Sequence, residues 1–187
     1  MPEKNNTAFK ISLSGLLIAV GIVIPMFSPI KIVLEPASFT LASHVAIFIA
    51  MFISPGVAGS VAIGTAFGFF LGGFPVVIVL RAASHIVFSL AGALFLRKLK
   101  GAKLFGLKLR LFSFSVALIH AFCELTVVSV FYFGGGMSAS FYQKGFFLSV
   151  LLLVGLGTVV HSMIDFEIAN GLLSVLKKQK SGVFGQP

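Results

Sequence analysis

Residues 76–88 read VVIVLRAASHIVF, an apolar run that carries an arginine at position 81 and a histidine at position 85. The run belongs to the apolar segment 75–97, and this whole segment is long enough for a helix to cross a lipid bilayer. An ionisable side chain inside such a helix costs free energy and marks a functional site by default. The stretch therefore predicts a transmembrane helix that carries a polar site.

The whole chain has the composition of a membrane protein. Of its 187 residues, 58% are hydrophobic and only 10% are charged, and the mean hydropathy is +1.10. Such a chain is too apolar for a water-soluble domain of this size. Backbone inside a bilayer must satisfy its own hydrogen bonds, and the apolar runs have the length of helices, so we predict an all-α fold. The polar first ten residues do not resemble a signal peptide, and the single Cys123 excludes an internal disulfide.

Six transmembrane helices in one compact bundle, a single domain of residues 1–187, are predicted from the positions of proline, glycine and charge clusters. The second and third are short and barely cross the hydrocarbon at about 1.5 Å per residue. The tight connection Ser54-Pro55-Gly56 joins them. The predicted spans are residues 10–28, 40–54, 56–72, 75–97, 109–133 and 146–176.

The distribution of basic residues predicts that both termini are cytoplasmic. Two lysines precede the first span, six basic residues lie between the fourth and fifth spans, and three lysines follow the sixth. Cytoplasmic loops of membrane proteins collect lysine and arginine, and with six spans these three regions share one side. The net charge of +9 therefore reflects topology, and we do not expect a nucleic-acid partner.

Three of the predicted helices each carry two ionisable residues spaced four apart, which places each pair on one helix face. One interpretation is a buried structural network in which Arg81 is paired with Glu124. The other is a polar pocket open to the outer side, where Arg81 binds an anionic group such as a carboxylate. Asp165 and Glu167 lie nearer the cytoplasm and are expected to be structural or interfacial rather than ligand-binding. The pairs are Arg81 and His85, His120 and Glu124, and His161 and Asp165.

Enzyme motifs are absent from the sequence. It has no HExxH, GxSxG or Walker A pattern, so we expect neither catalysis nor a cofactor in this chain. A proton-coupled carrier would use the same histidines and acids, but no inverted repeat is visible. The one internal echo, Ala-Ser-His at 42–44 and 83–85, is short enough to arise by chance. A structural membrane subunit without cargo stays open as an alternative.

Small residues recur every four positions in the first three spans, a pattern that lets membrane helices approach closely. The third span has two such faces, and at least one of them must pack inside the bundle. The other could receive the helix of a partner protein. The ridges are Gly15 and Ala19; Ala42, Ala46 and Ala50; Ala58, Ala62 and Ala66; and Gly64, Gly68 and Gly72.

These features together resemble the S component of an energy-coupling factor (ECF) vitamin transporter. The shared features are six spans in under 200 residues, a short second and third helix, the outer loop SPIKIVLEPAS at 28–38, a basic loop before the fifth span and small-residue ridges. The resemblance covers the whole chain. It implies a multi-pass protein of the bacterial plasma membrane that captures a vitamin at the outer face. It also implies docking on a transmembrane coupling protein with two ATPase subunits, which hydrolyse the ATP.

The resemblance also implies where the ligand and the partner bind. The loop from Lys31 to Phe39 would form part of a lid over the pocket. The coupling protein would contact small residues, Gly15 and Ala19 of the first helix or Ala58, Ala62 and Ala66 of the third. The first helix has Gly15-x-x-x-Ala19 where the family has AxxxA, which leaves open which of the two helices supplies the contact. The pocket would be lined by Arg81, His85, His120, Glu124 and His161.

The residue types in the pairs favour a small carboxylate as ligand. A cationic vitamin would call for acids and aromatic faces, whereas this set leads with Arg81. Flavin-sized ligands usually require more aromatic stacking than two tyrosines and no tryptophan supply, although 22 phenylalanines could contribute. Within the family this chemistry points to pantothenate first and nicotinate second. Glu124 would repel a bound anion unless it is paired or protonated.

Overall fold

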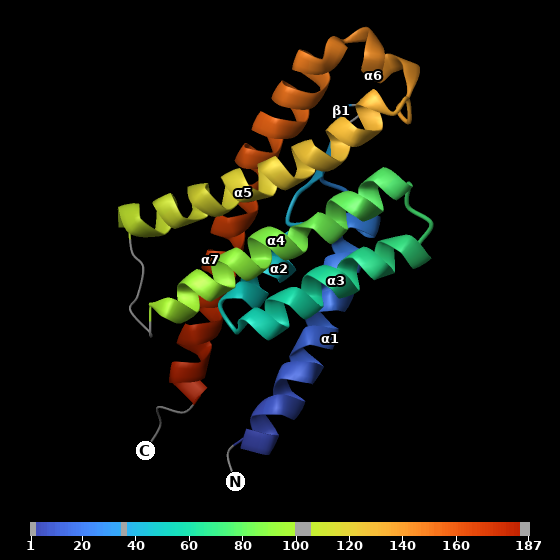
Figure 1. Cartoon of the computed structure of the whole chain (residues 1–187). Helices are drawn as coiled ribbons and strands as arrows, with labels where there is room; N and C mark the ends of the chain where they lie inside the picture. Colours follow the sequence, from blue (N-terminus) through green and yellow to red (C-terminus); the bar gives the residue numbers. More distant parts are fainter. Residues whose placement is uncertain (1–2, 35–36, 100–105, 184–187) are drawn as a thin grey trace.

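A computed structural model describes the backbone of residues 3–34, 37–99 and 106–183, and the side chains of residues 7–30, 39–99 and 106–176. It is a helical bundle with one small hairpin (Figure 1). The elements, in chain order, are α1 (Glu3–Phe27), β1 (Lys31–Leu34), β2 (Ala37–Thr40), α2 (Val45–Met51), α3 (Pro55–Leu71), α4 (Val76–Lys98), α5 (Gly106–Phe133), α6 (Ala139–Gln143), the π-helix η1 (Phe147–Leu156) and α7 (Gly157–Val183).

Four stretches of the described chain are long and apolar enough to cross a membrane. They are Thr7–Phe27, Val76–Lys98, Gly106–Phe133 and Phe147–Leu176, and Pro55–Leu71 is a shorter apolar helix. The α-helical class is therefore confirmed, and four of the expected spans correspond to long helices. The count of six spans is not confirmed. Helix α2 has only seven residues and is about 10 Å long, which is shorter than the hydrocarbon core of a bilayer.

The predicted span 40–54 is shortened at its beginning by a turn. Residues 41–44 are not helical, and Ala42 has a positive φ of 68°, which a residue with a side chain rarely adopts. At the other end α2 stops at Met51. Ser54 then caps α3 by accepting a hydrogen bond from the Val57 N–H, with Pro55 at the first helical position. Both ends of the predicted span 40–54 are therefore turns, and only Val45–Met51 is helical.

The outer loop at 28–38 contains a β-hairpin, which an all-α prediction did not include. β1 and β2 pair antiparallel, with Ile32 opposite Phe39 and Lys31 opposite Thr40. The strands Lys31–Leu34 and Ala37–Thr40 contain β-branched residues and flank Glu35-Pro36, which lie outside the described residues. The hairpin lies at the opposite end of the bundle from the start of α1 and the end of α7 (Figure 1).

The last predicted span is one continuous helix that begins with π-helical geometry and continues with α-helical geometry. Its first ten residues, Phe147–Leu156, form a π-helix, and the chain continues directly into α7. A short helix, Ala139–Gln143, precedes it and was not predicted. π-Helical turns are rare and often lie next to functional sites. Here the change from π to α geometry occurs at Gly157, beside the ring of Phe39.

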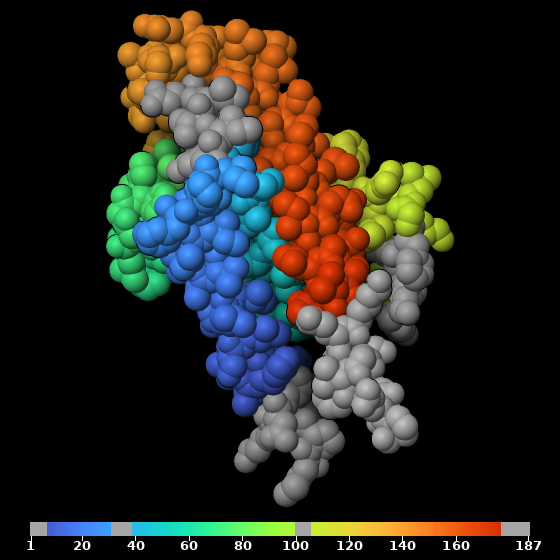
Figure 2. All heavy atoms as spheres, turned by 180° about the vertical axis from the view of Figure 1, so that it is seen from behind, coloured from blue at the N-terminus to red at the C-terminus, as the bar shows by residue number. Residues whose placement is uncertain are grey.

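Helix α3 packs against α1, α2 and α4, while Ile63, Phe67 and Phe70 on its remaining side are exposed. Its glycine face packs against α1, because a Cβ at Gly64 would come within 2.5 Å of Ile18 Cδ1 and one at Gly68 would overlap Ile22. Its alanine face, including Ala58 and Ala62, is fully buried as well. On the side opposite to the view of Figure 1, α2 and the turn before it are seen between α1 and α7 (Figure 2).

Candidate functional site

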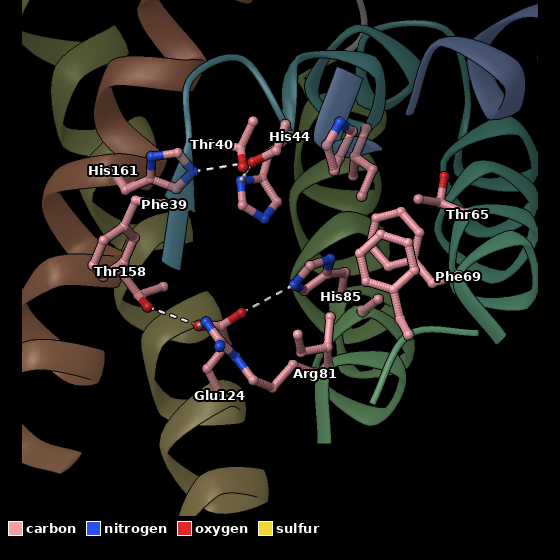
Figure 3. Close-up of a pocket in the computed structure, with 16 residues that line it drawn as sticks. Phe39, Thr40, His44, Thr65, Phe69, Arg81, His85, Glu124, Thr158 and His161 are labelled. Atoms are coloured by element: carbon pink, nitrogen blue, oxygen red, sulfur yellow. Dashed lines mark hydrogen bonds and ion pairs between the residues drawn. The ribbon is translucent and has the colours of Figure 1, made fainter. Parts of the chain in front are cut away.

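A partly open cavity of about 100 Å³ lies between α1, β2, α2, α3, α4, α5 and α7, with polar side chains on part of its mostly apolar wall (Figure 3). The cavity is lined by five of the residues that the sequence analysis assigned to the ligand, namely Phe39, Arg81, His85, Glu124 and His161. His120 lies directly behind His85 at a ring separation of 4.7 Å and does not line the cavity. The structure thus brings the predicted residues together, and their role in binding stays a prediction.

Arg81 and Glu124 form the charged part of the cavity wall. Arg81 lies on α4 and donates from Nη2 to Glu124 Oε2 of α5 over 2.8 Å. The carboxylate is almost fully buried, with 4% of its side chain exposed, while Arg81 is 13% exposed. The Nε–H of Arg81 is buried and has no hydrogen-bond partner among the described residues. Arg81 therefore keeps a donor that its pairing with Glu124 does not use.

Glu124 also contacts polar groups of α7, of α4 and of its own helix α5. Thr158 of α7 donates its hydroxyl to Glu124 Oε2 over 2.7 Å. The other oxygen, Oε1, lies 3.3 Å from His85 Nε2 and 3.5 Å from His120 Nε2. Burial of this carboxylate in a membrane helix is tolerable because each of its oxygens has such neighbours. The cavity wall is consequently tied together from α4, α5 and α7.

The hairpin reaches the cavity through Phe39. Its ring lies 5.5 Å from the His161 ring, and the absence of a side chain at Gly157 leaves room for it, because a Cβ there would be 2.5 Å from Phe39 Cζ. This position agrees with the expectation that residues 31–39 form part of a lid. Lys31, the other residue expected there, is in β1, and its side chain lies outside the described residues.

The sequence analysis missed His44 and Ser43 as members of this site. His44 precedes α2 and stands edge-on to the rings of His85 and His120 at 4.8 and 4.7 Å. The Ser43 hydroxyl lies 3.0 Å from His161 Nε2. Ser43 and His44 both line the cavity. The available signal was the repeated Ala-Ser-His at 42–44 and 83–85, which was attributed to chance.

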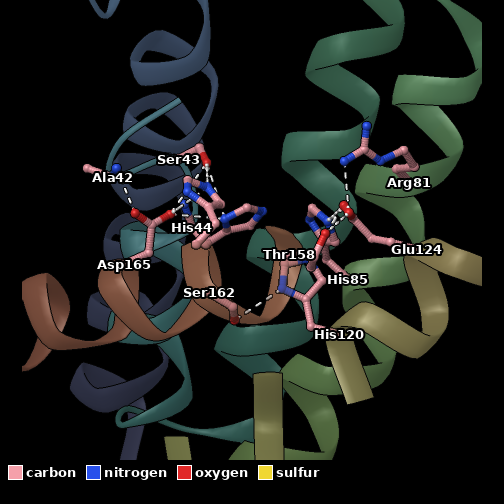
Figure 4. A network of polar contacts seen from close by, with 11 residues as sticks. Ala42, Ser43, His44, Arg81, His85, His120, Glu124, Thr158, Ser162 and Asp165 are labelled. Carbon is pink, nitrogen blue, oxygen red and sulfur yellow. Dashed lines mark hydrogen bonds and ion pairs between the residues drawn. The ribbon is translucent and has the colours of Figure 1, made fainter. Parts of the chain in front are cut away.

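Asp165 is structural, as the sequence analysis expected. It is fully buried and accepts hydrogen bonds from the backbone N–H groups of Ala42 and His44, at 2.7 and 2.9 Å. Its Oδ2 is also 3.0 Å from His44 Nδ1 (Figure 4). Asp165 on α7 thereby fixes the turn that leads from the hairpin into α2 and orients the imidazole of His44.

Comparison with known proteins identifies the family. Over 167 residues, the chain is 41% identical to the niacin transporter NiaX of Lactococcus lactis subsp. cremoris (strain MG1363), a match that covers 89% of this chain and 73% of that protein. The chain belongs to the S components of ECF vitamin transporters. No family model and no solved structure matches it. This S component is a transport subunit rather than an enzyme, and it is a multi-pass membrane protein.

The small-residue ridges of this S component differ in exposure. Gly15 and Ala19 of α1 are exposed, and nothing lies within 4 Å of a Cβ built at Gly15. The alanine ridge expected as the alternative contact is buried in the bundle, so in this conformation it is not accessible to a partner. The role of Gly15 and Ala19 stays a prediction. The buried ridge consists of Ala58, Ala62 and Ala66.

Proposed function

We propose that this S component captures niacin at the outer face of the membrane and delivers it to an ATP-driven coupling module. The sequence analysis ranked pantothenate first and nicotinate second. The relative of known function is named for niacin, which reverses that order. Two features of the cavity support this proposal. Its arginine suits the carboxylate that both acids carry, and its aromatic lining favours nicotinate over pantothenate.

The observation that carries the proposal is the placement of Arg81. Arg81 lines the cavity, and among the described residues its Nε–H has no hydrogen-bond partner, while Nη2 contacts Glu124. A planar carboxylate suits such a group because guanidinium donors are fixed in a fork. Pairing of Arg81 with Glu124 keeps that acid from acting as an isolated negative charge next to the ligand. Nicotinate and pantothenate both carry the required carboxylate.

The aromatic lining distinguishes between these two acids. Phe69 and Phe74 are stacked at a ring separation of 4.7 Å, and both line the cavity together with Phe39. Aromatic faces pack well against a flat pyridine ring, in offset or edge-on arrangements. Pantothenate is a flexible aliphatic chain, and immobilising its rotatable bonds costs entropy that a rigid ring does not lose. The cavity therefore fits nicotinate better.

The membrane arrangement and the partners are part of the same proposal. We propose that α2 and the turn before it form one short crossing, which together with the four long apolar helices and α3 would give six crossings. Both termini would then be cytoplasmic, in agreement with the basic residues near them, some of which lie outside the described residues. The exposed Gly15 and Ala19 would meet the coupling protein, and the ATPase subunits would supply the energy.

Ligand binding tests the substrate. Nicotinate, nicotinamide and pantothenate would each be titrated calorimetrically into the purified protein. We expect nicotinate to bind most tightly, pantothenate at least tenfold more weakly, and nicotinamide also more weakly because it lacks the carboxylate charge. Tighter binding of pantothenate, or binding of none of the three, would refute the niacin assignment.

Reconstitution separates the proposal from a proton-coupled carrier and from a structural subunit. We expect liposomes to accumulate labelled nicotinate only when this chain, the coupling protein, both ATPases and ATP are present together. Uptake by this chain alone along a proton gradient would instead indicate a carrier. Gly15→Leu should weaken co-purification with the coupling protein, whereas Gly171→Leu, an exposed position of α7, should not.

A further inference from the structure

All four histidines of the chain gather at one place beside the cavity, although they come from α4, α5, α7 and the residue before α2. Three of them, His44, His85 and His120, form what we call the histidine triangle. Their ring centroids are 4.7 to 4.8 Å apart, and each pair of rings meets edge-on. Burying imidazoles in a helical core costs more free energy than burying apolar side chains, because buried imidazoles need polar partners. A common ligand for the three rings would supply such a partner.

The spacing of the nitrogen atoms suits a metal ion. Glu124 Oε1 is 3.3 Å from His85 Nε2 and 3.5 Å from His120 Nε2. Tetrahedral zinc, with bonds of about 2.0 to 2.1 Å, separates neighbouring ligand atoms by about 3.4 Å. One candidate ligand atom from each of His44, His85, His120 and Glu124 lies within 4.8 Å of all the others. The atoms are thus already close to coordination distance of a shared centre.

His120 supplies an independent observation. Its side chain is fully buried, and its Nε2 has no hydrogen-bond partner in the described part of the chain. The contact with Glu124 at 3.5 Å is too long for a good hydrogen bond. A buried polar atom without a partner normally costs free energy, so its retention at this point favours a ligand there.

Two of the three histidines, His44 and His120, are held in place through their other ring nitrogen (Figure 4). His44 holds its Nδ1 against Asp165 Oδ2 at 3.0 Å, which leaves Nε2 for an ion. The Nδ1 of His120 lies 3.2 Å from the Ser162 hydroxyl. Histidines that bind metals almost always make such a contact through the other ring nitrogen, because it fixes the tautomer and the ring orientation.

The remaining histidine belongs to a second possible set with His44 and Asp165. In that set the polar atoms are already satisfied. His161 Nε2 lies 3.0 Å from the Ser43 hydroxyl, and Asp165 accepts two backbone N–H groups as well as the contact from His44. We therefore favour the set that contains the unpartnered nitrogen of His120.

We propose that the histidine triangle and Glu124 hold a divalent transition-metal ion, with zinc as the first candidate. Three imidazole nitrogens and one carboxylate oxygen are typical ligands of zinc and also suit cobalt and nickel. Arg81 and Thr158 donate hydrogen bonds to Glu124 Oε2 and thereby orient the carboxylate, so that Oε1 faces the histidines. The sequence alone led us to expect no cofactor, and this proposal replaces that expectation.

A bound dication would change the charge of the cavity. With neutral histidines, Arg81, Glu124 and Asp165 together carry a formal charge of about −1, which disfavours a buried anion. A dication raises this to about +1 and places positive charge on the same wall as Arg81. This consequence for vitamin binding rests on the proposed function, whereas the metal site itself does not.

The test is a metal titration without any vitamin, so that the metal site and the niacin assignment can fail separately. The protein would carry an affinity tag without histidines and be stripped with a chelator. We expect calorimetry and elemental analysis to find one zinc ion per chain, and cobalt in its place to give the visible absorption of a tetrahedral site. Absence of stoichiometric zinc binding to the wild-type protein would overturn the proposal.

Variants locate the ion. His120→Ala and Glu124→Gln should lower zinc affinity more than a hundredfold, and Ser162→Ala, which keeps every ligand, about tenfold to a hundredfold. His161→Asn is the matched control, an imidazole at the same cavity outside the proposed set, and should stay within threefold of wild type. Thermal unfolding would verify that each variant is folded. Unchanged affinity in His120→Ala, or an equal loss in His161→Asn, would refute this assignment.

Discussion

The carboxylate of Asp165 makes the turn before α2 sensitive to a single substitution. It is fully buried on α7 and accepts hydrogen bonds from the N–H groups of Ala42 and His44 at 2.7 and 2.9 Å. Ala42 has a positive φ of 68°, a conformation that needs such external support. Loss of the carboxylate should therefore loosen the connection between the hairpin and the bundle.

The size of the effect follows from the donors left without a partner. Asp165→Ala leaves two backbone N–H groups unsatisfied, and at about 1–3 kcal/mol for each the free energy of unfolding should fall by about 2–6 kcal/mol. Asp165→Asn keeps one accepting oxygen, so that one donor is lost and the cost is about 1–3 kcal/mol. For a chain of this length, each kcal/mol lowers Tm by about 2–4 °C.

The chain contains no tryptophan, so thermal unfolding in detergent would be followed by circular dichroism. This measurement ranks the stabilities of wild type, Asp165→Asn and Asp165→Ala. Glu167→Ala is the matched control, an acid two residues along the same helix that is exposed, and it should change stability by less than about 0.5 kcal/mol. The reasoning is refuted if Asp165→Ala lowers Tm no more than Glu167→Ala, or if Asp165→Asn is the more damaging of the two changes at position 165.

Two glycines give further predictions, and Gly171, with open space around it, is the control position for both. Gly157→Ala should push the ring of Phe39 out of the cavity wall and weaken nicotinate binding several-fold in calorimetry, while Gly171→Ala leaves the affinity unchanged. Gly68→Val should lower the stability by about 1–3 kcal/mol through overlap with Ile22, a loss that thermal unfolding would detect and that Gly171→Val should not reproduce.

Much of the site could be predicted from the sequence, because an ionisable residue in an apolar run is rare and expensive. The four-residue spacing placed Arg81 with His85 and His120 with Glu124 on single faces, and those faces meet in the structure. His44 could not be found in this way. It precedes a helix of only seven residues, so that no periodic pattern surrounds it, and it reaches the site because Asp165 fixes the turn.

The small-residue ridges show the limit of local patterns. A ridge of alanine or glycine indicates close packing but not the identity of the neighbour. On α3 the alanine ridge is buried, and Gly64 and Gly68 of the glycine ridge pack against α1, so both ridges are used within the bundle. The hairpin and the π-helix were likewise missed, since strand pairing and a π-helical register depend on contacts with the rest of the bundle.

The central claim is that Arg81 recognises the carboxylate of the vitamin, and the most direct test compares nicotinate with nicotinamide on the same variant. The ratio of the two affinities cancels any general damage that Arg81→Gln causes by leaving Glu124 without its partner. We expect the wild-type protein to prefer nicotinate by about tenfold to a hundredfold, the value of a charge-assisted hydrogen bond of about 1.5–3 kcal/mol. Arg81→Gln should abolish this preference, and Arg97→Gln, an exposed arginine of the same helix, should keep it. A preference that survives in Arg81→Gln would contradict the account.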